Sequence, residues 1–121
     1  MLLNVLKSKI HRAVVTHADV NYEGSISLDL NLMEAAGLYE NELVHVWNAT
    51  NGNRITTYVM TPAERGSGTV CINGAAAHKV HVGDIVIIAT FAHVDEKDIK
   101  NHRPNKVIVG PNNAVRVVKH V

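Results

Sequence analysis

A series of short strand-like segments, each followed by turn residues, is the feature that most constrains the fold of this chain. Residues 25–30 alternate polar with apolar side chains, as expected for a strand with one buried face. Two further segments flank Asn51-Gly52, a pair that favours a β-hairpin because both residues tolerate positive φ. The segments with strand character are residues 13–16, 25–30, 43–47, 55–60, 69–72, 84–91, 107–109 and 114–118. Many short strands predict a mainly β chain that is closed or nearly closed into a barrel.

Helical signals are confined to short segments of the chain. Asp29 or Asn31 is suited to cap a helix over residues 32–36, and Gly37 is suited to end it. Residues 95–101 have room for one or two helical turns. Residues 84–91 form a nearly continuous apolar run, which predicts a strand that is buried on both faces.

Length and composition are those of an ordinary globular domain. We expect a single domain over residues 1–121, because a chain of this length can bury a core of its own. The formal net charge is only +1 and no basic stripe with interleaved aromatics is present, which argues against a nucleic-acid partner. The longest apolar run is far too short to span a membrane. The single cysteine, Cys71, excludes an internal disulfide and favours the cytoplasm.

Eight histidines invite a metal hypothesis, but their spacing does not support one. His78 and His81 lie three residues apart without a third ligand at a recognisable spacing. The His-Glu-x-x-His pattern is absent, and one cysteine is too few for a thiolate site. We therefore expect no metal cofactor.

Three segments contain residue types suited to chemistry. Residues 22–25, Tyr-Glu-Gly-Ser, suit a simple turn, although a hydroxyl beside a flexible peptide bond can also attack the preceding carbonyl. Arg54 and Tyr58 share one face of their predicted strand and Thr57 lies on the other, which suits either an exposed surface or a carboxylate site. Residues 73–78 form either a tight turn into a short helix or a backbone cradle for an anion. The residues alone leave these alternatives open.

Taken together, these segments resemble the pyruvoyl-dependent aspartate decarboxylase family, bacterial enzymes that make β-alanine for pantothenate synthesis. The similarity runs through most of the chain and weakens after about residue 92. The matching segments are residues 9–12, 15–19, 22–25, 35–37, 47–48, 50–52, 57–58, 63–67, 73–78 and 82–88. The resemblance implies a double-psi β-barrel with a few short helices.

The resemblance also implies that the chain cuts itself between Gly24 and Ser25, into residues 1–24 and 25–121. The Ser25 hydroxyl would attack the Gly24 carbonyl to form an ester, and elimination and hydrolysis would then leave a pyruvoyl group at position 25. This covalent group would be the cofactor, without a metal or pyridoxal phosphate. It would form a Schiff base with L-aspartate, which would be converted to β-alanine and CO2.

The same resemblance implies roles for other residues. Tyr58 would be the proton donor, and Thr57 and Asn73 would stabilise the oxyanion of the cleavage reaction. Arg54, helped by Lys9, would bind the substrate carboxylate. The substrate-binding residues implied in this way are Lys9, Arg54, Thr57, Asn73, Gly74, Ala75 and Ala76. The family forms homotetramers in which neighbouring subunits share the sites, and it gives no clear role for Glu23.

Two alternatives belong to other functional classes. The chain could be an uncleaved double-psi barrel that serves as a binding module, or a processed decarboxylase that acts on another amino acid. Denaturing electrophoresis distinguishes the first alternative, and a panel of substrates distinguishes the second.

Overall fold

The computed structural model describes residues 1–121 and consists mainly of β-strands, with one short α-helix and three 3-10 helices. The strands are β1 (Leu2–Val14), β2 (His17–Asp19), β3 (Ser25–Leu28), β4 (Leu43–Asn48), β5 (Arg54–Tyr58), β6 (Val70–Asn73), β7 (Ile85–Asp95), β8 (Asn105–Val109) and β9 (Val115–His120). The helices are α1 (Leu30–Ala36), η1 (Gly74–Lys79), η2 (Glu96–Asn101) and η3 (Pro111–Asn113). The prediction of a mainly β fold with a few short helices is confirmed.

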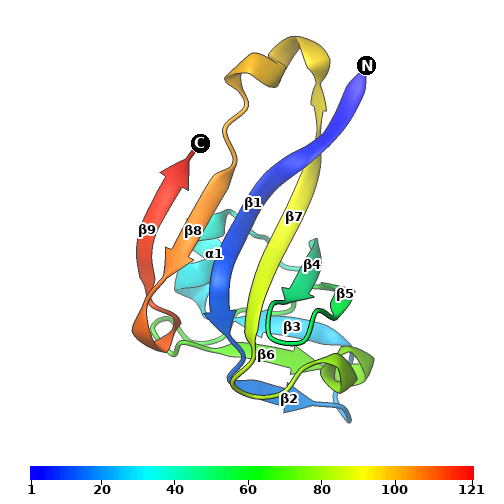
Figure 1. The fold of residues 1–121 in the computed structure, drawn as a ribbon, viewed down its shortest axis with the longest axis vertical. Coiled ribbons are helices and arrows are strands. Elements are labelled where there is room, and N and C mark those ends of the chain that lie inside the picture. Colours follow the sequence, from blue (N-terminus) through cyan, green and yellow to red (C-terminus); the bar gives the residue numbers. More distant parts are fainter.

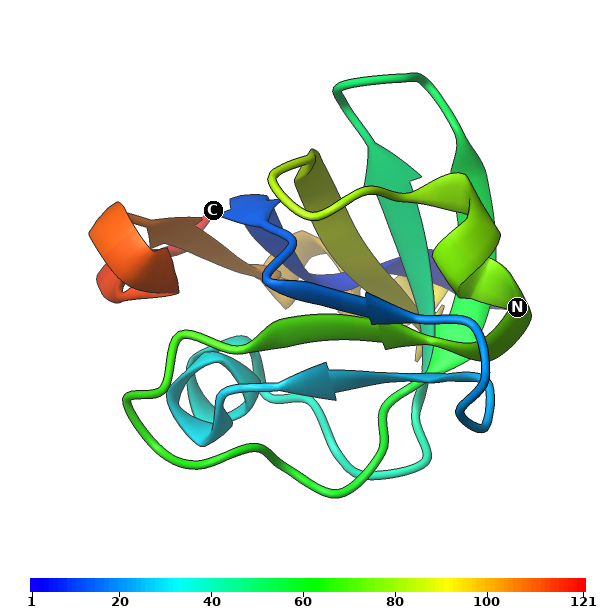
Figure 2. The ribbon, with the colours of Figure 1, turned by 90° about the horizontal axis from the view of Figure 1, so that it is seen from below.

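The strands form two sheets. The larger sheet has the order β5-β4-β7-β1-β8-β9, and the smaller has the order β2-β6-β3. Strands β1 and β7 pair from Leu2 opposite Asp95 to Val14 opposite Ile85, and they form the long ribbon in Figure 1. Seen from below, β2, β6 and β3 lie side by side across one end of this ribbon (Figure 2). Neither sheet closes on itself, and the arrangement is compatible with a double-psi β-barrel.

A single cluster of 18 buried apolar side chains joins the two sheets and α1. In the larger sheet, Ile10, Ile88 and Val46 occupy one cross-strand row and are all buried. In the smaller sheet, Ile26 and Ile72 pair with each other and are fully buried. Since side chains alternate along a strand, the neighbouring residues of the larger sheet point to its outer face, away from the core.

Local signals in the sequence explain the ends of α1 and the β4–β5 hairpin. Asp29 caps α1 by accepting a hydrogen bond from the Asn31 backbone N–H at 2.8 Å, and Gly37 ends the helix with φ of 68°. Both features were expected from the sequence. The hairpin at Asn51-Gly52 is also present, although only Gly52 adopts positive φ.

The structure corrects three predictions that were made from the sequence. Strand β1 begins at Leu2, far earlier than residue 13, and β2 was not predicted at all. The strand predicted at residues 84–91 is buried on both faces only over residues 88–90, because Ile87 and Phe91 on its outer face are half-exposed. The outer face of the larger sheet therefore has apolar side chains without a covering layer. None of the helices is long and apolar enough to cross a membrane.

Candidate functional site

Ser25 lies at the first position of β3, opposite Asn73 at the end of β6. Its side chain is nearly inaccessible, with 1% relative exposure. The Ser25 hydroxyl has two possible acceptors for its proton, the Glu23 carbonyl oxygen and Met60 Sδ, each at 3.1 Å. Asn73 Nδ2 donates to the same hydroxyl oxygen at 3.4 Å. The hydroxyl is therefore held by a network of neutral groups directly after the Gly24 carbonyl.

The side-chain amide of Asn73 is in contact with two sulfur atoms as well as with Ser25. Its Oδ1 accepts from Cys71 Sγ at 3.2 Å, and its Nδ2 lies 3.4 Å from Met60 Sδ. Burial, together with the nearby charge of Asp19, raises the pKa of the Cys71 thiol. Cys71 is therefore protonated at neutral pH and can act as a hydrogen-bond donor.

Gly74 brings the start of η1 into close contact with the Gly24 backbone. Gly74 has φ of +71°, and a Cβ at this position would lie 2.5 Å from Gly24 Cα and 2.6 Å from Gly24 N. It would also lie 3.0 Å from the Tyr22 carbonyl oxygen. A Cβ on Gly24, in contrast, would meet no atom within 4 Å. The Gly24–Ser25 peptide is therefore packed on one side and open on the other.

A small pocket with a volume of about 330 Å³ lies beside this peptide. Its lining residues are His17, Tyr22, Ser27, Met60, Thr69, Cys71 and Asn73. Asn73 and Met60 connect the pocket to the Ser25 hydroxyl. No lysine or arginine lines the pocket, so the chain itself offers a carboxylate no permanent cation there.

The basic residues and the tyrosine predicted to act on the substrate lie elsewhere. Arg54 and Tyr58 are exposed on the outer face of β5, and the Arg54 guanidinium lies 5.0 Å from the centroid of the Trp47 ring. The row formed by Lys9, Ala89, His45 and Thr56 places Lys9 on the same outer face. Three strand spacings separate β1 from β5, which corresponds to roughly 14 Å.

The remaining predicted residues, Thr57, Ala75 and Ala76, make no hydrogen bond with Ser25. Thr57 is half-buried on the face of β5 opposite Arg54, and β5 in turn packs against η1. Ala75 and Ala76 lie in η1, directly after Gly74. The structure thus brings Gly24, Ser25, Asn73 and Gly74 together, and it leaves Lys9, Arg54 and Tyr58 on another surface of the chain.

Two residues at this site were not predicted from the sequence, Met60 and Cys71. Cys71 was detectable, because it precedes Asn73 by two residues and therefore shares its face of the strand. Met60 follows β5, where the alternation of the strand no longer fixes the direction of a side chain. Its contact with Ser25 required the tertiary structure.

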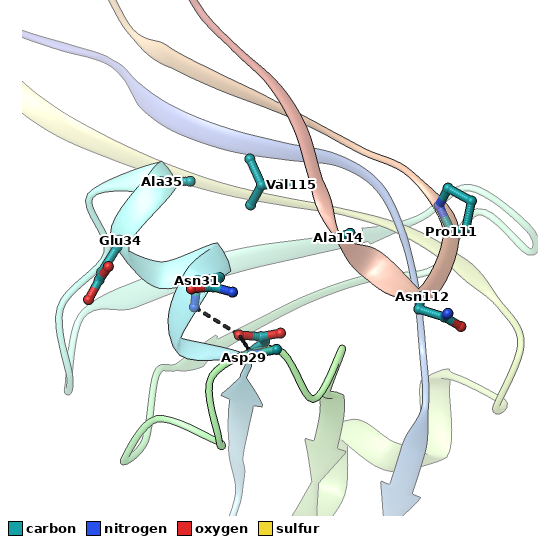
Figure 3. A pocket seen from close by; sticks show the side chains of 9 residues that line it. Asp29, Asn31, Glu34, Ala35, Pro111, Asn112, Ala114 and Val115 are labelled. Carbon is teal, nitrogen blue, oxygen red and sulfur yellow. Dashed lines mark hydrogen bonds between the residues drawn. The ribbon is translucent and has the colours of Figure 1, made fainter.

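The largest pocket, with a volume of about 750 Å³, lies between α1 and the segment from η3 into β9 (Figure 3). Three of its polar residues, Asp29, Asn31 and Glu34, are already hydrogen-bonded within the chain. The Asp29 carboxylate accepts from the backbone N–H groups of Asn31, Gly66 and Gly68. Burial alone would raise the pKa of Asp29, but these N–H groups and the charge of Arg65 hold the pKa below its usual value. Asp29 therefore stabilises the fold of this region.

No three His, Cys, Asp or Glu side chains are grouped so that they could hold a metal ion. His17 is the one histidine that lines the small pocket, and its Nδ1 lies 2.8 Å from Thr16 Oγ1. The chemistry available at Ser25 therefore depends on hydroxyl, amide and sulfur groups.

Comparison with known proteins places this site in a family. The family model for aspartate decarboxylase matches residues 1–116. The chain is 54% identical to aspartate 1-decarboxylase of Xylella fastidiosa strain Temecula1 over 120 residues, which cover 99% of this chain and 94% of the relative. It is 51% identical to aspartate 1-decarboxylase of Polaromonas naphthalenivorans over 116 residues, which cover 96% and 91%. With a family model that spans nearly its whole length and relatives of this similarity, the chain belongs to the aspartate decarboxylase family.

Proposed function

We propose that the chain cleaves itself between Gly24 and Ser25 and then decarboxylates L-aspartate to β-alanine and CO2, as a step of pantothenate biosynthesis. Membership of the family and the printed names of the relatives support the reaction and the substrate. The observation that carries the proposal is the environment of Ser25. Its buried hydroxyl directly follows the Gly24 carbonyl, Asn73 Nδ2 donates to this hydroxyl, and Gly74 packs closely against the Gly24 backbone.

In the proposed cleavage, Ser25 Oγ forms a bond to the Gly24 carbonyl carbon, and the Gly24–Ser25 C–N bond breaks to give an ester. Loss of the Ser25 Cα proton then expels the Gly24 carboxylate and leaves a dehydroalanine at position 25. Water replaces its nitrogen, which leaves as ammonia, and a pyruvoyl group remains. Donors near the Gly24 carbonyl lower the barrier by stabilising the negative charge on its oxygen. Asn73 and Thr57 are the side chains that we assign to this role.

The residues around position 25 suit a pyruvoyl group. Such a group is small, uncharged and rich in acceptors, and Asn73 Nδ2 is a donor already directed at this position. When present, the group supplies the electron sink that decarboxylation requires. Gly74, Ala75 and Ala76 leave space beside it, and Tyr58, supplied by a neighbouring copy of the chain, is the group that we assign as proton donor to the substrate carbon.

Binding of the substrate requires a cation that the pocket beside Ser25 lacks. We infer that the active form is a homotetramer in which Arg54 and Lys9, on the outer face of the larger sheet, complete the site of a neighbouring copy. The half-exposed aromatic side chains on this face support association, because Trp47 and Phe91 lie 6.4 Å apart without a covering layer. We further propose that the chain acts as a single domain in the cytoplasm.

The mass of the purified chain under denaturing conditions tests the proposal. Cleavage at Gly24–Ser25 gives two fragments, residues 1–24 and 25–121, whereas an uncleaved binding module gives one species of 13.2 kDa. Ser25→Ala should remain intact and inactive, because the attacking oxygen is absent. Ser27→Ala is the matched control, since Ser27 lies on the same strand without a bond to Asn73. A substrate panel then separates aspartate from other amino acids.

A further inference from the structure

The Asn73 side-chain amide has two ends of similar shape and opposite hydrogen-bonding character. In the structure its NH2 end faces Ser25 Oγ and Met60 Sδ, and its carbonyl end faces Cys71 Sγ. Rotation of the amide by half a turn would direct Oδ1 toward the Ser25 hydroxyl. Ser25 would then donate its proton to Asn73, and the donor assigned to the cleavage reaction would be lost.

The two sulfur atoms on either side of the amide discriminate between these orientations. A thioether has no proton and can only accept, so Met60 favours the NH2 end. A protonated thiol donates, so Cys71 favours the carbonyl end at 3.2 Å. Cys71 lies on the same face of β6 as Asn73, because the two residues are two positions apart in the strand.

We propose that Cys71 is a positioning residue for self-cleavage, whose thiol selects the orientation of Asn73 that presents its NH2 group to Ser25. This inference rests on the proposed function, since it assigns a consequence only to a chain that cuts itself. Cys71 makes no hydrogen bond with Ser25, and its effect passes through Asn73. Its raised pKa keeps the thiol in its donating form at neutral pH.

The test is the rate at which purified precursor yields the 25–121 fragment, measured by intact mass. Cys71→Ala should cleave roughly two- to tenfold more slowly, the range that corresponds to one neutral hydrogen bond. Cys71→Ser keeps a donor at the same place and should cleave close to the parent rate. Cys71→Val, which fills the space without a donor, should be slow like the alanine variant.

A double-mutant comparison separates positioning from a general effect on folding. In an Asn73→Ala background, Cys71→Ala should cause no further slowing, because there is no amide left to orient. Thermal unfolding of each variant identifies any that fails to fold. The cleavage rates of the valine and serine variants then show whether a hydrogen-bond donor at position 71 is required. Equal rates for the serine and valine variants, or full additivity with Asn73→Ala, would overturn the role of Cys71. An intact parent chain would instead refute the proposed function itself.

Discussion

Replacement of Gly74 by alanine should block self-cleavage by displacing the peptide that is cut. The new Cβ would lie 2.5 Å from Gly24 Cα, whereas ordinary contact begins near 3.4 Å, so the Gly24 backbone must move by about 0.9 Å. A displacement of about 1 Å at a reacting centre can reduce a rate on the order of 10²-fold. We expect a similar reduction in the rate of cleavage, because Ser25 and Gly24 would no longer keep their relative positions.

The same substitution also has a conformational cost that must be separated from the contact with Gly24. Gly74 has φ of +71°, and an alanine in the left-handed region costs roughly 1–2 kcal/mol. Gly52 provides the matched control, because it has φ of +81° and a Cβ there would meet no atom within 4 Å. Gly52→Ala should therefore lose a similar free energy of unfolding and still cleave normally.

The assay follows the fraction of intact chain by mass over time, alongside thermal unfolding of both variants. The expected result is slow cleavage in Gly74→Ala alone, with comparable loss of stability in the two. If Gly74→Ala were processed at the rate of Gly52→Ala, the close packing of η1 on Gly24 would have no part in maturation. If both variants were blocked, global destabilisation would explain the result and the contact would not.

Three further predictions concern turnover and stability. Tyr58→Phe should mature normally but lose roughly 10²–10⁴ in turnover, the usual contribution of a general acid, as measured by β-alanine release from fully processed enzyme. Arg54→Lys should lose part of kcat/KM for L-aspartate, because lysine keeps the charge without the two parallel hydrogen bonds, and Arg54→Ala should lose most of it. An unchanged preference of Arg54→Ala for aspartate over asparagine would contradict this role. Asp29→Asn should lower the free energy of unfolding at pH 7 by about 1–2 kcal/mol. Because the pKa of Asp29 is lowered in the folded chain, its stabilisation is present above the unfolded pKa and disappears as the pH falls through the folded pKa. The difference in Tm between Asp29→Asn and the parent should therefore shrink below about pH 4.

Strands and caps were predictable where a local rule determines them. The alternation at residues 25–28 places Ile26 and Leu28 in the core, and Asp29 and Gly37 mark the ends of α1 because each satisfies a specific backbone requirement. Strand β1 was missed over most of its length, because its pairing partners in β7 lie 71 to 93 residues away along the chain. No local pattern within residues 2–12 indicates that pairing. A β-bulge near Arg12 further interrupts the alternation of buried and exposed side chains.

The site was predictable in a similarly uneven way. Ser25, Asn73 and Gly74 were identified through the family resemblance, and the structure places them in contact. The pattern of small residues after Asn73 left both a ligand cradle and a tight turn open, whereas the structure gives Gly74 a definite reason to lack a side chain. Met60 had no signal in the sequence, since its contact depends on how β5 ends beside β3.

The separation of the two groups of residues has a physical consequence for the assembly. A dicarboxylic substrate carries a charge that is costly to bury without a partner, and the pocket beside Ser25 has no lysine or arginine. The cations that suit this task, half-buried Lys9 and exposed Arg54, lie on a sheet face that points away from the core of the same chain. Rotation of the Lys9 and Arg54 side chains cannot bring them to the Ser25 pocket, because the alternation of a strand fixes the face on which each residue lies. A second copy that lays its outer face against the Ser25 pocket would provide the charge and would also cover Trp47 and Phe91. In the proposed function, self-cleavage would therefore need only groups that one chain brings together, whereas recognition of the substrate would need the assembly.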